Sequence, residues 1–125
     1  MIFEWSEYLN LAKELAGKVT TSANQEAKLR AAISICYYAA FIKARNYLRD
    51  NEGIDIPDTG EAHQYVREQF AISSERNRQK IADNLRYLLS YRRKVDYDDF
   101  VPGLSGITPI AIRLSEQVIS DLNNL

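Results

Sequence analysis

The side chains best suited to chemistry in this sequence are a run of cations between positions 76 and 94. This stretch contains seven cations and a single acid, Asp83. Such a local excess can attract phosphate even though the net charge of the whole chain is −1. An ordinary solvated helix face, whose charges serve only solubility, is the alternative. The seven cations are Arg76, Arg78, Lys80, Arg86, Arg92, Arg93 and Lys94.

Arg92 stands apart from the other cations because of its position in the helical pattern. It shares a helical face with Leu85, Leu88 and Val95, so we expect its side chain to point inward or into a cleft. An arginine in such a place pairs with a carboxylate or binds an anionic ligand.

Other reactive residue types are sparse. His63 is the one histidine, and we expect a helix-start or polar surface contact, with catalysis as the alternative. The acids Asp96, Asp98 and Asp99 lack the twelve-residue loop spacing of a calcium site. Cys36 lies among apolar residues, which predicts an inert core thiol. We therefore predict no bound metal and no cofactor.

Apolar residues recur at helical spacing along most of the chain. They predict helices over about 3–15, 24–49 and 60–71, a fourth that reaches Val95, and a fifth that begins at Pro109 after a loop over 96–108. No segment shows the alternation of a strand. The fold class predicted is all-α, one domain over 1–125 that forms an up-and-down bundle of four to five helices.

Helix ends are predicted from capping residues. Gly17 is a stop signal, since glycine tolerates the left-handed turn that follows a helix. The expected N-terminal signals are Ser22 with Gln25, Asp58 with Glu61, Ser73 or Ser74, and Thr108 followed by Pro109.

The cysteine count and the hydropathy bear on location. One cysteine excludes a disulfide within the chain and favours a reducing compartment. The start of the sequence does not read as a signal peptide, and no apolar stretch approaches the roughly 20 residues of a membrane span. We expect a cytoplasmic protein with no membrane partner.

The segment over 24–49 is the most informative one, because it carries no charge between Ala31 and Ile42. A helix that is apolar nearly all round must be covered on all sides. We expect the other helices to surround it, or a second copy of the chain to cover part of it. Its short side chains permit a close helix approach, and its candidate core or dimer residues are Ile35, Tyr37, Tyr38 and Phe41.

Three stretches of the sequence follow a recognisable order. The first is Arg30-Ala-Ala-Ile-Ser-Ile-Cys-Tyr-Tyr-Ala-Ala-Phe41, followed by Ala44-Arg45. The second is His63, Val66 and Phe70, and the third is Leu85-Arg86-x-Leu88-Leu89 with Arg92-Arg-Lys-Val-Asp-Tyr97. Over about 5–97 this pattern resembles the HEPN family of RNA-targeting and nucleotidyltransferase-associated domains.

The resemblance implies a HEPN-like bundle that forms a homodimer and binds RNA, a nucleotide or a nucleotidyltransferase partner. It further implies one half of a toxin–antitoxin or defence system. The residues that it points to for RNA or nucleotide binding are Arg86, Arg92, Arg93, Lys94 and Tyr97.

Ribonuclease members of the family place a histidine four to six residues after an arginine, and these residues meet across a dimer. In this chain the fifth residue after Arg92 is Tyr97, and no histidine stands nearby. A tyrosine with a pKa near ~10 is a poor proton shuttle at neutral pH. A non-catalytic binding module is therefore preferred. The alternatives are a metal-independent endoribonuclease with a displaced site, drawn from Arg92, Arg93, Tyr97 and His63, and a ligand-free helical scaffold.

Overall fold

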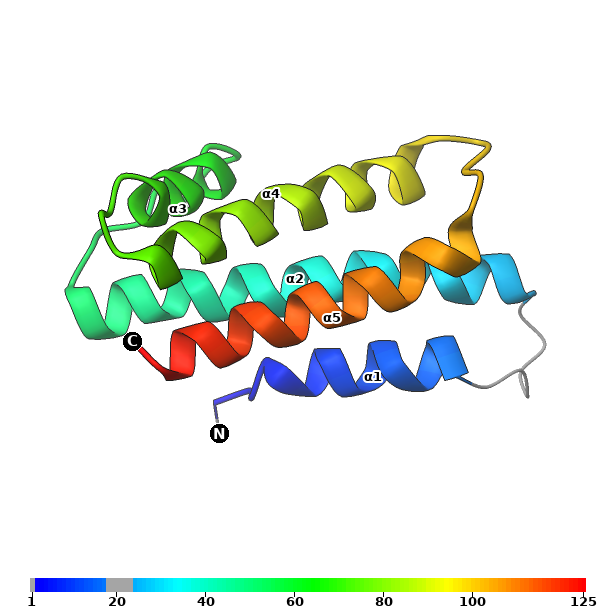
Figure 1. Cartoon of the computed structure of the whole chain (residues 1–125), viewed down its shortest axis with the longest axis horizontal. Coiled ribbons are helices and arrows are strands. Elements are labelled where there is room, and N and C mark those ends of the chain that lie inside the picture. Colours follow the sequence, from blue (N-terminus) through cyan, green and yellow to red (C-terminus); the bar gives the residue numbers. More distant parts are fainter. Residues whose placement is uncertain (1, 18–23) are drawn as a thin grey trace.

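The computed structural model describes residues 2–17 and 24–125, which form five helices and no strand (Figure 1). Four long helices run alternately up and down, and a short one, α3, lies beside the first part of α4 (Figure 1). The prediction of an all-α bundle is confirmed. None of the described helices is both long enough and apolar enough to cross a membrane. The helices are α1 (Ser6–Gly17), α2 (Gln25–Glu52), α3 (Ala62–Ala71), α4 (Arg76–Tyr97) and α5 (Leu104–Asn123).

The first two helices begin where a side chain accepts a free backbone N–H. The Glu4 carboxylate accepts from the Ser6 backbone N–H at 3.1 Å, and α1 starts there rather than near residue 3. The Asn24 side chain accepts from the Ala27 N–H at 2.8 Å, which makes Asn24 the N-cap of α2. The predicted cap Ser22 lies outside the described residues. The C-cap of α2 is Gly53, whose φ of 65° favours glycine.

The predicted side-chain cap of α3 is wrong. At α4 the predicted Ser73 lies two residues before the N-cap that the structure shows. Glu61 is the N-cap of α3 and makes no side-chain cap hydrogen bond, while Thr59, not Asp58, accepts from its backbone N–H at 3.3 Å. At α4 the N-cap is Glu75, and Ser73 accepts from the Glu75 N–H at 3.1 Å.

The start of α5 differs most from the sequence prediction. The helix begins at Leu104, directly after Gly103 with its φ of 71°, so Pro109 lies inside it. Thr108 is no cap: its hydroxyl donates to the Leu104 carbonyl at 2.8 Å. Pro109 cannot donate to the Ser105 carbonyl, but Ser105 is exposed and close to the helix start, where water can replace the lost bond.

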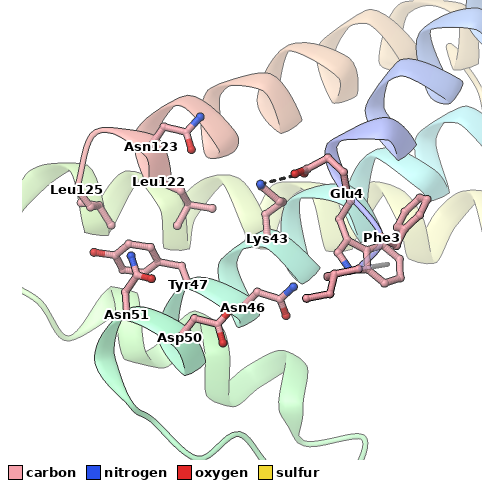
Figure 2. A pocket seen from close by; sticks show the side chains of 12 residues that line it. Phe3, Glu4, Lys43, Asn46, Tyr47, Asp50, Asn51, Leu122, Asn123 and Leu125 are labelled. Carbon is pink, nitrogen blue, oxygen red and sulfur yellow. Dashed lines mark hydrogen bonds and ion pairs between the residues drawn. The ribbon is translucent and has the colours of Figure 1, made fainter.

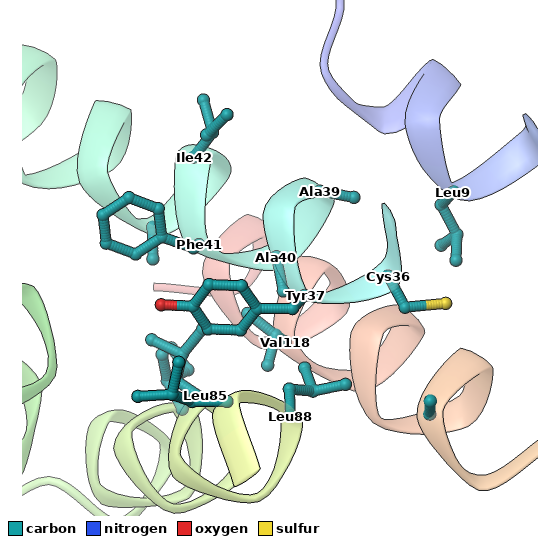
Figure 3. Packing of buried hydrophobic residues seen from close by; sticks show 14 of the residues in the cluster. Leu9, Cys36, Tyr37, Ala39, Ala40, Phe41, Ile42, Leu85, Leu88 and Val118 are labelled. Carbon is teal, nitrogen blue, oxygen red and sulfur yellow. The ribbon is translucent and has the colours of Figure 1, made fainter. Parts of the chain in front are cut away.

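The core is built around α2, which packs against α1, α4 and α5 along its length and against α3 near its end. The alanines at 32, 39, 40 and 44 are wholly buried, which permits close helix approach. Tyr37, Leu85, Leu88 and Val118 fill the space between α2, α4 and α5 (Figure 3). The expectation that the other helices surround α2 is thus confirmed for most of its circumference.

Cys36 and Ser115 join α2 to α5 inside this core. The Ser115 hydroxyl donates to the Cys36 carbonyl at 2.9 Å, so a buried polar group is satisfied. Burial raises the pKa of the Cys36 thiol to about 12, which leaves it protonated and unreactive, as expected of a core cysteine.

One strip of α2 stays partly open. Ala31 is exposed, and Ile35 and Tyr38 are half-buried, although each lies on an apolar part of the helix. These residues recur at helical spacing, so they share one face. We call Ala31, Ile35 and Tyr38 the open strip.

We expect Leu88→Ala to lower the free energy of unfolding by about 2–5 kcal/mol, because Leu88 is wholly buried between helices. The matched control is Leu11→Ala, at a residue that is 41% exposed, with an expected loss of about 0.5 kcal/mol or less. Guanidinium chloride unfolding of both variants measures the difference. Equal losses would contradict the core described above.

Candidate functional site

A buried tyrosine and the histidine of α3 form the centre of the candidate site. Tyr37 is wholly buried on α2, and its hydroxyl lies 2.5 Å from Nδ1 of His63. The His63 ring stacks on Phe41 at 4.3 Å between ring centroids and lies nearly parallel to the Tyr37 ring at 5.6 Å. His63 thus lies at the start of α3, as expected, and is half-buried against α2.

The protonation of this pair follows from burial. Burial raises the pKa of Tyr37 above its usual value, so its hydroxyl keeps its proton. His63 Nδ1 is the partner found for this buried hydroxyl among the described residues, and a buried O–H needs an acceptor, so we assign the hydroxyl as the donor and Nδ1 as the acceptor. Burial also lowers the pKa of His63, and the positive charges of Arg92, Arg67 and Arg93 act in the same direction. The His63 ring is thus neutral at pH 7 and carries its proton on Nε2.

Arg92 faces the same pair of tyrosines from α4. Its guanidinium carbon lies 5.0 Å from the Tyr38 ring centroid and 5.8 Å from that of Tyr37. Its Nε donates to the Asp96 carboxylate at 2.9 Å, and Ser34 donates to the same carboxylate at 3.4 Å. The side chain is only 18% exposed, so the inward arginine with a carboxylate partner is confirmed.

The acids Asp96, Asp98 and Asp99, at the end of α4 and directly after it, do not form a metal-binding group. Asp96 is held by Arg92, and the described residues contain no group of three His, Cys, Asp or Glu side chains that could hold a metal ion.

A groove between α3 and α4 is lined by three cations of the basic run and by Arg67 of α3. It has a volume of about 890 Å³, and four cations and one carboxylate, that of Asp98, line it; of the cations, Arg86 lies 3.8 Å from the Asp83 carboxylate on α4. Arg67 Nη1 is buried there without a hydrogen-bond partner among the described residues. We call this the basic groove; it is lined by Arg67, Arg86, Leu89, Ser90, Arg93, Lys94, Tyr97 and Asp98.

Sequence reasoning missed Arg67 and underrated His63. The two residues lie four apart on one face of α3, and that spacing was the available signal. What the sequence could not show is the contact across helices, because Tyr37 and His63 are 26 residues apart.

The cations of α4 lie in different surroundings. Arg78 is structural: it pairs with Glu52 and lies 4.8 Å from the Phe70 ring centroid. Of the five residues predicted to bind RNA or a nucleotide, the basic groove brings together Arg86, Arg93, Lys94 and Tyr97 but not Arg92. Arg92 lies on another face, with His63 near the tyrosine pair. The structure therefore places Arg92 with His63, and Tyr97 with Arg93 and Lys94.

A further pocket shows why open space alone does not define a site. About 410 Å³ lies between the N-terminal segment, α2 and the end of α5 (Figure 2). Its charged side chains are already paired, Lys43 with Glu4 at 3.1 Å and Asp50 with Arg49 at 2.8 Å. It offers no uncompensated charge to a ligand.

Comparisons with protein-family profiles, with curated protein sequences and with solved structures found no match. The resemblance to the HEPN family is carried by the sequence pattern, and it stays a prediction.

The lowered pKa of His63 predicts a pH-dependent stability. The unfolded chain binds a proton near pH 6.5 while the folded chain does not, so the free energy of unfolding should fall as the pH drops through 6.5 towards the folded pKa. Above 6.5 this contribution is fully present. Denaturant unfolding at a series of pH values between about 5.5 and 8 measures it.

His63→Gln is the control, because this chain has no other histidine. The variant should lose the change in stability over that pH range while keeping the contributions of carboxylates at lower pH. A wild-type profile that is flat across the range would contradict the buried, neutral imidazole.

Proposed function

We propose that this chain is a HEPN-like binding module that holds the phosphates of RNA or a nucleotide in the basic groove and acts as a homodimer. The observation that carries the proposal is the imbalance of charge there. Arg67, Arg93 and Lys94 form no ion pair among the described residues, Arg86 has only an exposed contact of 3.8 Å with Asp83, and one carboxylate, that of Asp98, lines the groove. Phosphate oxygens accept hydrogen bonds from guanidinium groups and would offset this excess of positive charge.

Aromatic side chains beside the cations favour nucleic acid over a simple anion. Tyr97 lines the groove and is 73% exposed. On the same helix Tyr87 is 48% exposed, and the Arg86 guanidinium lies 4.9 Å from the centroid of its ring. Exposed rings of this kind can stack on unpaired bases, and stacking is worth about 1–3 kcal/mol per base. Unpaired bases are most available in single-stranded RNA.

The finer parts of the proposal depend on the family resemblance. They are a nucleotidyltransferase partner and membership of a toxin–antitoxin or defence system. The proposal places the protein in the cytoplasm, where a reduced cysteine such as Cys36 is stable. A ligand-free scaffold would not account for the excess of positive charge in the basic groove.

A ribonuclease with a displaced site is the second candidate, because Arg92 and His63 both adjoin Tyr37 and Tyr38. Against it, Nδ1 of His63 already accepts the Tyr37 proton, and its Nε2 carries a proton of its own. A neutral imidazole in this state has no free lone pair with which to act as a base.

Binding of a fluorescent single-stranded RNA of about twelve nucleotides, followed by anisotropy at about 50 and about 200 mM salt, tests the proposal. We expect tighter binding at low salt. In the variant Arg93→Gln/Lys94→Gln the slope of log affinity against log salt should shrink by about 1.4, since each phosphate contact to a single strand contributes about 0.7.

The control variant Lys13→Gln/Arg113→Gln removes the same charge from α1 and α5, outside the basic groove. It should keep the wild-type slope. Equal slopes in both variants, or no binding at low salt, would overturn the proposal. RNA cleavage that requires both Arg92 and His63 would instead favour the ribonuclease.

The homodimer is proposed to form through the open strip of α2. The strip is apolar, it recurs along one helix face, and no described helix buries it completely. In a two-fold dimer the same strip on two copies would cover itself.

We expect sedimentation velocity to show a dimer for the wild type and a monomer for Ile35→Glu, because the new carboxylate would be buried without a partner. Leu11→Glu, at a partly exposed leucine of α1, should remain a dimer. A wild type that is monomeric at every concentration would exclude this interface.

A further inference from the structure

A second cavity, separate from the basic groove, is also lined by His63. It has a volume of about 530 Å³ and is enclosed by the second half of α2, the segment 54–59 and the start of α3. This volume is in the range of small-molecule sites. Its apolar wall is formed by Phe41, Ile54, Ile56, Pro57 and Ala62.

Arg45 brings a cation without an ion-pair partner among the described residues into this cavity. Its guanidinium contacts the neutral amide oxygen of Asn46 at 3.0 and 3.1 Å, and no carboxylate of the described residues lies within ion-pairing distance. Burial and the nearby Arg49 lower its pKa, while the Asp50 carboxylate acts in the opposite direction. A half-buried cation in this position is stabilised by an anion.

Two further donors face the same space. His63 lines the cavity, and its neutral ring carries a proton on Nε2 because Nδ1 accepts from Tyr37. The first turn of α3 begins in the same wall at Ala62. Thr59 already accepts the N–H groups of Glu61 and Ala62, which leaves those of His63 and Gln64 as donors at the positive end of the helix.

The acids of the cavity limit what can bind. Asp55 and Asp58 also line it, both are exposed, and neither forms an ion pair within the described ranges. They would repel a polyanion such as a nucleic-acid strand, but they can accept hydrogen bonds from hydroxyl groups. A small ligand with a single anionic group fits this arrangement better than a polymer does.

We propose that this cavity, which we call the Arg45 cavity, binds a small molecule with one phosphate or carboxylate group joined to an apolar or planar body. Arg45 holds the anionic group, Nε2 of His63 donates a hydrogen bond to it, and the apolar wall covers the body. The site is distinct from the basic groove, and it does not depend on RNA binding.

The single histidine makes the test direct, because its Cε1 proton gives one resolved NMR signal. We expect phenyl phosphate or benzoate to raise the pKa of His63 relative to sodium chloride of equal ionic strength, since a bound anion favours the imidazolium. Backbone amide signals of 54–63 should shift and saturate. Comparing the affinities of phenyl phosphate and benzoate decides between a phosphate and a carboxylate head group. Comparing each with inorganic phosphate or acetate, which lack the ring, measures the contribution of the apolar body.

Arg45→Gln should weaken binding about ten-fold or more, because it removes a hydrogen bond to a charged group. Arg45→Lys, which keeps the charge, should retain part of the affinity and guards against a folding defect, which circular dichroism would also reveal. Arg76→Gln, at an exposed arginine of α4, should bind as the wild type does. RNA affinity should be unchanged in Arg45→Gln, which separates this site from the basic groove. Shifts that do not saturate, or equal binding in Arg45→Gln, would overturn the proposal.

Discussion

The burial of α2 is the constraint on which the rest of the structure depends. Its 28 residues contact every other helix, and wholly buried alanines let those helices approach closely. Tyr37 lies on the most enclosed part of α2, so its hydroxyl cannot reach water and needs a partner inside the protein. His63 supplies it, and the contact fixes the start of α3 against α2. The geometry of the candidate site is thus a consequence of how the core is closed.

The same burial accounts for the distribution of charge. Three arginines, at 67, 92 and 93, lie near enough to this enclosed pair to lower the pKa of His63, and of these only Arg92 forms an ion pair within the described chain. Charges next to a buried region are poorly screened, so an unpaired cation there is more costly than one on an open surface. Phosphate would lower that cost. The two proposed sites adjoin α3, one at Arg67 and the other at His63. Their chemistry differs because two acids accompany two arginines in the Arg45 cavity, whereas one acid accompanies four cations in the basic groove.

The sequence predicts the fold better than it predicts the site, for physical reasons. Helical spacing and glycine stops are local, and they locate five helices, the central one and the inward Arg92. Capping signals are local too, but one segment can contain more than one of them. Thr108 with Pro109 is a good signal for a helix start, yet α5 begins five residues before Pro109, directly after Gly103, and accommodates the proline in its interior. The hydrogen bond from Tyr37 to His63 and the unpaired nitrogen of Arg67 arise from packing between helices. No periodicity within one segment encodes them.

Tyr38 connects the open strip to the charged site and bears on how a dimer would use both. It is half-buried within the strip, and its ring lies 5.0 Å from the Arg92 guanidinium carbon. In the proposed dimer, contact through this strip would draw two copies of Arg92 towards one interface, which is the arrangement that the HEPN resemblance implies. Catalysis would still require His63 to release Tyr37, and that would leave a wholly buried hydroxyl without a partner, at a cost of about 1–3 kcal/mol. The packing thus favours a site that holds a phosphate over one that moves a proton to or from it.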